Sequence, residues 1–271
     1  MRGKRFGLML LSMPALVFLT LPLLGLLVKA DVVRFGAYVC CDEVKSALSL
    51  SLITATISAL ISLLIGTPLA YWLAYGRFRG KRIVDTLVDL PVVLPPTVAG
   101  LALFMALGRQ GLLGPRLQAL GISLPYTTAA VVLAQTFVSC PFFIRQARVG
   151  FQSVPPHLVL ASRTLGASAS RTFWRVTLPL AWHALVAGLI MAWSRAIGEF
   201  GATLIFAGNM EGTTRTMPLA IYAQFIGEGK IDSSVVLALT LVAVSFLVMI
   251  TTKMLLANES RSAEAQAVAL V

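Results

Sequence analysis

Two ionisable residues of opposite charge, Arg195 and Glu199, stand four positions apart inside an apolar stretch of the sequence. Residues at this spacing are neighbours on one face of a helix and can form an ion pair. A charge at membrane depth costs about 2.5–3.5 kcal/mol on insertion scales, and such residues usually face a bundle interior or a cavity. Two roles follow: a structural link between helices, or a cationic site that attracts an anion while Glu199 keeps its binding weak.

Short polar side chains accompany this pair in the apolar segments. Their hydroxyl or amide groups can donate hydrogen bonds to an oxyanion, although most Ser and Thr residues inside membranes bond a helix carbonyl or a neighbouring helix. Ser139 is one such residue; the predicted substrate-pathway residues are Arg195, Glu199, Thr97, Thr203 and Asn209. No cluster of chemical groups at one depth suggests a catalytic site, and three cysteines make no metal site or disulfide framework.

The composition identifies the environment of these residues. Of 271 residues, 58% are apolar and only 12% are charged, whereas a soluble domain carries about 25% charged residues. So little charge cannot cover a water-facing surface, and so much apolar surface excludes disorder. The sequence therefore predicts an integral membrane protein.

Six charge-free runs, each 19 to 31 residues long, divide the chain. A helix needs about 20 residues to cross the hydrocarbon, and a backbone without access to water must be helical. The alternation of a β-barrel is absent. We predict an all-α fold in which residues 1–271 form one transmembrane domain, with six spans near residues 6–28, 46–76, 88–108, 124–144, 180–207 and 233–256.

The basic residues, which give a net charge of +11, lie mostly between the runs. With an even number of spans, one side holds 14 Lys and Arg residues and the other side holds 7. The positive-inside rule then places both termini in the cytoplasm of a multi-pass protein of the cell (inner) membrane. Because topology accounts for the charge, we expect no nucleic-acid partner.

The segment between spans four and five, residues 145–178, is longer than a simple connector. Pro155 and Pro156 break the chain, residues 157–165 predict a short helix, and Gly166 is typical of its C-terminal end. Ser168 or Ser170 then predicts the cap of a second helix. Two interpretations are open: a docking element for a partner, or an amphipathic helix lying on anionic membrane lipid.

The motif Ala161-Ser162-Arg163-Thr164-Leu165-Gly166, followed after nine residues by Val176-Thr177-Leu178-Pro179, resembles the cytoplasmic EAA loop of ABC importer permeases. The spacing matches throughout, with Val in place of Ile. The acidic residue of the family pattern is missing, since Val159 and Leu160 stand where it would lie. The resemblance implies that an ATPase subunit docks on Ala161, Ser162, Arg163, Leu165, Gly166, Leu178 and Pro179.

Two further segments resemble oxyanion permeases of the molybdate type. Residues 89–100 read Asp-Leu-Pro-Val-Val-Leu-Pro-Pro-Thr-Val-Ala-Gly, and residues 194–203 read Ser-Arg-Ala-Ile-Gly-Glu-Phe-Gly-Ala-Thr. With the EAA loop, the resemblance covers roughly residues 46–226. It implies an ATP-driven importer that moves molybdate or tungstate inward by alternating access.

Two alternatives to the molybdate interpretation remain. Sulfate and thiosulfate permeases share Arg-Ala-x-Gly-Glu-Phe-Gly, although the Leu-Pro-Pro segment and Met-Pro-Leu-Ala-Ile-Tyr at 217–222 favour molybdate. An ion-coupled secondary transporter would need intramembrane carboxylates and inverted repeats. Glu199 is the one carboxylate deep in a predicted span, and no repeat is visible.

The resemblance also implies the partners: a second copy of the permease, two ATP-binding cassette subunits and an external oxyanion-binding protein. The glycine-containing loop at 76–82 lacks the spacing of a phosphate-binding loop. We therefore expect no cofactor in this chain, with ATP and Mg held by the ATPase, and no enzymatic activity of the permease itself.

Overall fold

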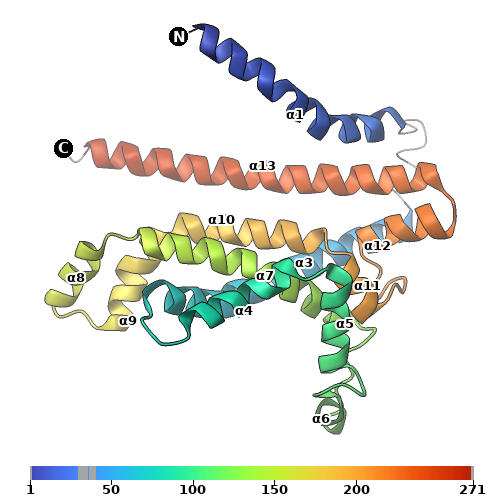
Figure 1. Ribbon diagram of the computed structural model, residues 1–271, viewed down its shortest axis with the longest axis horizontal. Coiled ribbons are helices and arrows are strands. Elements are labelled where there is room, and N and C mark those ends of the chain that lie inside the picture. The colour runs from blue at the N-terminus through green and yellow to red at the C-terminus, as the bar shows by residue number, and fades with distance from the viewer. Residues whose placement is uncertain (1, 30–35, 37–40, 270–271) are drawn as a thin grey trace.

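The computed structural model describes residues 2–29, 36 and 41–269. Within this part of the chain every regular element is helical, which confirms the all-α prediction. Among the described residues, the helices long and apolar enough to cross a membrane number five, or six if one bent pair counts as a span. The long elements are α1 (Arg2–Lys29), α3 (Asp42–Tyr75), α7 (Thr128–Ser153), α10 (Leu178–Ile197) and α13 (Ile231–Ala269), shown in Figure 1.

The core is a bundle of α3, α7 and α10, which pack against one another along their lengths. Small residues permit the close approach: a Cβ on Gly66 of α3 would lie 2.7 Å from the ring of Phe143 on α7. The buried face of α3 also carries Ser58, whose hydroxyl donates to the Val132 carbonyl of α7 at 3.0 Å. Membrane helices commonly associate through such small and weakly polar residues, because lipid provides no hydrophobic drive.

The third predicted span is divided in the structure. Instead of one helix over 88–108, the structure has α4 (Lys81–Val93) and α5 (Pro96–Leu107), and the chain bends by 114° between them. Pro95 has no N–H for a helical bond and restricts Leu94 to extended backbone, while Pro96 suits the first position of the next helix. Consequently α5 leaves the bundle sideways and carries α6 (Gly114–Ala119) at its tip (Figure 1).

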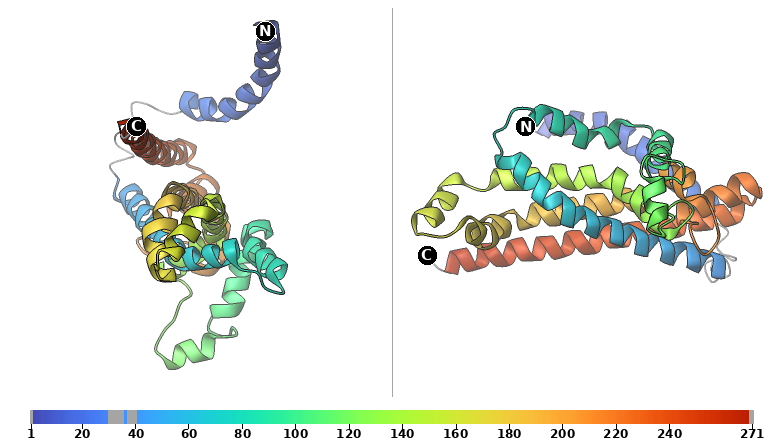
Figure 2. Two further views of the ribbon diagram at one scale, coloured as in Figure 1. Left: turned by 90° about the vertical axis from the view of Figure 1, so that its left-hand side faces the viewer. Right: turned by 90° about the horizontal axis from the view of Figure 1, so that it is seen from below.

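The remaining half of that span, α4, lies along α7. Two ion pairs join the helices: Arg145 to Asp89 at 2.6 Å, and Arg148 to Asp85 at 2.7 Å. Seen end-on, α4 and α13 lie on opposite sides of the core bundle (Figure 2, left). Helix α1 contacts α13, and no residue in the apolar part of α1 is buried.

The fifth predicted span, 180–207, is interrupted as well. Helix α10 ends at Ile197, and a separate short helix, α11 (Gly201–Ala207), follows. Helices α5 and α11 pack so closely that a Cβ on Gly100 would lie 2.7 Å from the Ala202 carbonyl oxygen. The two interrupted spans therefore meet near their breaks.

The segment between spans four and five is shorter than the predicted loop 145–178, because α7 continues to Ser153. It contains α8 (Pro156–Thr164), α9 (Ala169–Thr172) and the π-helical turn η1 (Phe173–Thr177), which runs directly into α10. Gly166 ends α8 with a φ of +83°, and the Ser168 hydroxyl caps α9 by accepting from the Arg171 N–H at 3.2 Å. Both predicted end signals are confirmed.

The opposite end of the bundle contains one short apolar helix that we did not anticipate: α12 (Met217–Tyr222), continued by the π-helical turn η2 (Ala223–Gly227). Its first N–H, on Met217, donates to the Ser51 hydroxyl of α3 at 2.7 Å. This bond satisfies an otherwise unpaired helix-end donor and anchors α12 to the core.

Candidate functional site

Arg195 and Glu199 form an ion pair of 2.6 Å at the end of α10. The two side chains differ in solvent exposure: that of Arg195 is 28% exposed and that of Glu199 is 1% exposed. Glu199 lies beyond Ile197, the last helical residue, so the pair spans the helix break and does not lie on one helix face as the spacing suggested. The structure thus brings the predicted partners together in a different local setting.

Glu199 has a second bond that explains its burial. Its other carboxylate oxygen accepts from the Ala202 N–H in the first turn of α11, at 2.8 Å. Arg195 stands in the last turn of α10 and Glu199 just before α11, so each charge complements the helix end beside it. The pair therefore closes the break in span five, and a structural role is built into it.

Arg195 also lines an open cavity of about 580 Å³ between α7, α10 and α13. Among the described residues that line it, Arg195 alone is charged; the others are Phe142, Ala187, Ile190, Met191, Ser194 and Met249. Apolar walls lower the local dielectric constant, which strengthens the attraction of a guanidinium for an anion. The site therefore contains one cation, Arg195, whose charge is balanced by Glu199 and which lines an apolar cavity.

Thr97 and Thr203 lie where α5 packs against α11, near the breaks in spans three and five. Thr97 is an exposed residue in the first turn of α5, and a Cβ on Gly201 would lie 3.2 Å from its backbone nitrogen. Thr203 is fully buried on α11, and Ser139 is fully buried on α7. Among the described residues, neither of these two buried hydroxyls has a hydrogen-bond partner. Two of the predicted donors thus adjoin the broken ends of spans three and five.

Asn209 belongs to a different cluster. It lies in the loop after α11, where its carbonyl oxygen accepts from the Arg215 Nε at 3.1 Å. Its amide nitrogen donates to the Leu219 carbonyl at 3.5 Å. Both ends of the side chain therefore bond within the chain, and this polar network is separate from the Arg195 pair.

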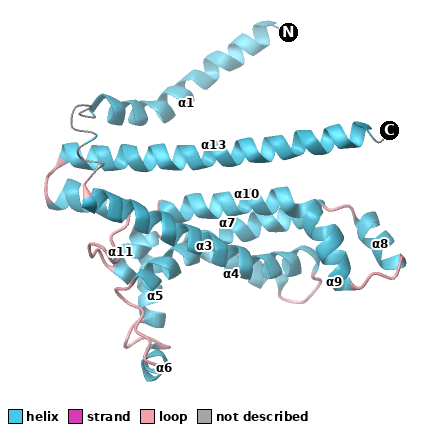
Figure 3. Ribbon diagram, turned by 180° about the vertical axis from the view of Figure 1, so that it is seen from behind, coloured by secondary structure: helices cyan, strands magenta, loops and turns pink. Residues whose placement is uncertain are grey.

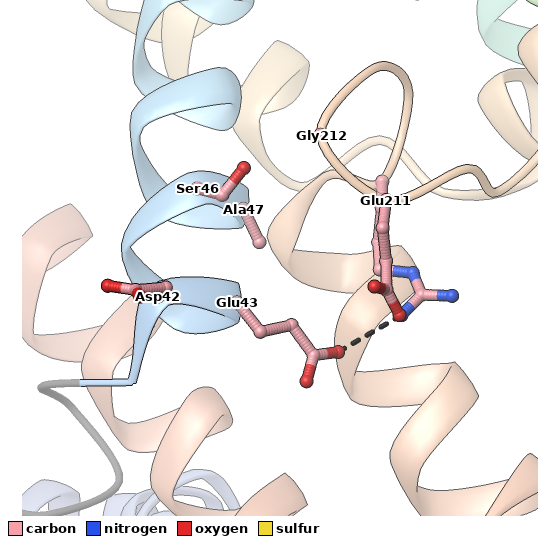
Figure 4. A pocket seen from close by; sticks show the side chains of 7 residues that line it. Asp42, Glu43, Ser46, Ala47, Glu211 and Gly212 are labelled. Atoms are coloured by element: carbon pink, nitrogen blue, oxygen red, sulfur yellow. Dashed lines mark hydrogen bonds and ion pairs between the residues drawn. The ribbon is translucent and has the colours of Figure 1, made fainter.

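Arg215 is the centre of that second cluster, and the sequence had not singled it out as a site residue. Its guanidinium, only 15% exposed, pairs with Glu43 of α3 at 3.0 Å and also with Glu211. Gln224 donates to the second oxygen of Glu43 at 3.3 Å. Figure 4 shows the pocket of about 230 Å³ at this cluster, where Glu43 and Glu211 approach from separate elements.

No local signal identifies this contact, because Arg215 and Glu43 are 172 positions apart. The pairing joins the loop before α12 to the first turn of α3. Arg215 is already matched by two carboxylates, and Asp42 also lines the pocket. The cluster therefore locks together this end of the bundle and presents an acidic rim.

The predicted docking residues lie at the other end, on α8 and the following turn (Figure 3). Leu165 is 88% exposed and Leu160 is 65% exposed, whereas the Ser162 hydroxyl bonds that of Thr172 at 3.0 Å and so joins α8 to α9. Ala161, Arg163 and Gly166 are exposed. Leu178 is half-buried and Pro179 exposed in the first turn of α10, so the motif combines an open apolar surface with its attachment to span five.

Comparison with known proteins is consistent with this architecture. Residues 66–258 match the family model described as "Binding-protein-dependent transport system inner membrane component". The molybdenum transport system permease proteins ModB of Mycobacterium tuberculosis and Mycobacterium bovis are 43% identical over 239 residues, which cover 88% of this chain and 90% of each relative. A probable sulfate transport system permease protein of Chlorokybus atmophyticus is 40% identical over 141 residues, 52% of this chain and 49% of that protein.

The fold has a counterpart among solved structures. A bacterial alginate ABC transporter, in complex with its alginate pentasaccharide-bound periplasmic protein, superposes with a TM-score of 0.75 at 18% identity. The match covers 93% of each chain, which supports the arrangement of helices. The chain belongs to the binding-protein-dependent transport system inner-membrane component family, the permease subunits of ABC transporters.

Proposed function

We propose that this permease moves molybdate, and tungstate as its close chemical analogue, from an external binding protein into the cytoplasm. The observation that carries the proposal is Arg195, the one charged residue among the described residues lining an apolar cavity, which is paired with a buried carboxylate. The two mycobacterial molybdenum permeases match 88% of the chain, whereas the sulfate permease matches 52% of it. The longer match therefore favours molybdate, and the site chemistry fits a tetrahedral oxyanion.

A weak cationic site suits transport of a tetrahedral dianion. The guanidinium offers several N–H donors to oxyanion oxygens, and its planar fork can engage two of them. Glu199 competes for the same donors, which keeps the anion from being trapped in a deep energy well. Thr97 and Thr203, beside the breaks in spans three and five, would supply further hydroxyl donors along the path.

The assembly would contain two permease copies, two ATPase subunits and one external binding protein. ATP and Mg would bind to the ATPase subunits, and α8 with α9 would dock on them through Leu165 and its neighbours. Closure of the ATPase pair would then switch the permease between inward-facing and outward-facing states. The breaks at Leu94–Pro95 and Gly198–Phe200 are the places where spans three and five can bend, because continuous helical bonding is already interrupted there.

We further propose that both termini and α8 face the cytoplasm of the inner membrane, as the charge distribution between the spans indicates. Cys41, at the end opposite α8, is exposed, and the preceding Cys40 lies outside the described residues. A membrane-impermeant maleimide applied to intact cells should label reduced Cys41. In a variant whose Cys40 and Cys41 are replaced by Ser, cysteine placed at exposed Ser170 should be labelled only after permeabilisation. Labelling of this Ser170→Cys variant in intact cells would contradict the proposed topology.

Reconstitution provides the test of substrate and energy source. The permease, its ATPase and its binding protein in proteoliposomes should take up radioactive molybdate only with internal ATP. Tungstate should compete at equimolar concentration, whereas sulfate should not compete at a large excess. Equal competition by sulfate would favour the sulfate alternative, and uptake driven by an ion gradient without ATP would identify a secondary transporter.

A further inference from the structure

Three aromatic rings from three different elements meet at the docking end of the molecule: Tyr71 of α3, Phe151 of α7 and Phe173 of η1. The Tyr71 ring lies 5.0 Å from that of Phe173 and 5.4 Å from that of Phe151, in both cases nearly perpendicular. Phe151 and Phe173 complete the triangle at 6.2 Å. Edge-to-face pairs at these separations are favourable. Their interaction energy depends on ring orientation as well as on ring separation, so a rotation of one ring in this aromatic triad weakens its contacts with the other two.

The triad is anchored on the core side. Phe151 is fully buried, and its carbonyl at the end of α7 accepts from the Tyr75 hydroxyl at 2.7 Å. The same carbonyl also accepts from the Val154 N–H at 3.3 Å, so the Tyr75 bond adds a link from α3 to the C-terminal end of α7. Helices α3 and α7 therefore present Tyr71 and Phe151 as a fixed pair of rings.

Phe173 belongs instead to the docking side. It directly follows Thr172, whose hydroxyl bonds Ser162 of α8, so α8, α9 and the start of η1 are linked. The π-helical turn that Phe173 begins leads into Pro179 of α10, which has no N–H to donate to the preceding turn. Such turns frequently mark functional sites in helices. A displacement of α8 and α9 must therefore move Phe173 against the other two rings.

We infer that Tyr71 and Phe151 position Phe173, and that this triad is the joint through which a displacement of α8 and α9 reaches spans two and four. The inference rests on the proposed function, in which an ATPase displaces α8 and α9. A close-packed contact transmits displacement because it cannot be compressed. A neighbouring aromatic pair makes no such connection: Trp72 stacks on Phe78 at 4.2 Å, and the Trp72 side chain is exposed at the end of α3.

The test compares variants of the complete transporter in proteoliposomes, with molybdate uptake and ATP hydrolysis measured on the same sample. Tyr71→Leu should lower uptake per ATP hydrolysed at least fivefold while the ATPase subunits stay bound. Tyr71→Phe should retain the wild-type ratio, because ring edges make the contacts. Trp72→Leu is the matched control, which removes the nearby aromatic pair at an exposed side chain and should leave the ratio unchanged.

Two results would overturn the inference: wild-type coupling in assembled Tyr71→Leu, or a Tyr71→Leu/Phe173→Leu double variant whose defect is the product of the single defects. If Tyr71→Leu does not assemble, Phe173→Met keeps the side-chain volume while removing the ring, and should show the same fivefold loss. If the wild type moves no molybdate, the proposed substrate is wrong. In that case the measurement that tests the triad is the increase in ATP hydrolysis caused by the binding protein. Tyr71→Leu should abolish this increase, and Tyr71→Phe should retain it.

Discussion

Neutralising both members of the ion pair, in Arg195→Gln/Glu199→Gln, should leave an assembled transporter whose molybdate uptake is roughly 10- to 100-fold slower. The estimate follows from hydrogen bonds to charged groups, which are worth about 1.5–3 kcal/mol. The double variant avoids a buried unpaired carboxylate, and the amide introduced in place of Glu199 keeps an oxygen that can accept from the Ala202 N–H. The cap of α11 should therefore survive while the cation beside the cavity is lost.

Single variants separate the structural role from the transport role. Arg195→Ala leaves Glu199 buried and unpaired, which should destabilise the fold by about 3–5 kcal/mol, so its low uptake alone is ambiguous. Arg195→Lys should be milder because the charge remains although the planar fork is lost. Ser194→Ala, in the lining of the same cavity, is the matched control and should transport normally. Uptake should be measured per assembled complex, and wild-type uptake by the double variant would leave Arg195 with a structural role alone.

Replacing Leu165 with Asp should release the ATPase subunits while the permease folds normally. Leu165 is 88% exposed in the isolated chain, so the substitution removes no contact from the permease core. Burial of a Leu side chain at an interface is worth about 1.5–3 kcal/mol, which predicts a roughly 10- to 100-fold weaker ATPase affinity. Copurification of the ATPase with the detergent-solubilised permease, at several salt concentrations, measures this loss.

A matched substitution distinguishes loss of docking from a general effect of surface charge. Helices α5 and α6 lie away from α8 (Figure 3), and Leu112, which follows α5 and precedes α6 in the chain, is 82% exposed. Leu112→Asp introduces the same charge at a similarly exposed position and should leave the ATPase bound. Equal retention of ATPase by Leu165→Asp would show that α8 does not carry the docking surface.

The sequence by itself determined the class of fold and the order of its parts. Low charge and long apolar runs require membrane helices because an unpaired backbone is costly in hydrocarbon. The ends of the α8 region were also predictable, since a glycine with positive φ and a serine cap act within a few residues. These features depend on local composition and short-range bonding, so they needed no knowledge of tertiary contacts.

Only the tertiary structure decided where spans three and five break and what the charged residues contact. Pro95 is compatible with a kink or a helix start, and the sideways course of α5 depends on its packing at Gly100 against α11. The spacing of Arg195 and Glu199 suggested one helix face, but the chain leaves the helix between them. Glu43 and Arg215 are brought together from 172 positions apart. Sequence spacing describes neighbours along a helix, whereas such contacts depend on how separate helices pack. This packing placed Thr97, Thr203 and the Arg195–Glu199 pair beside the two breaks.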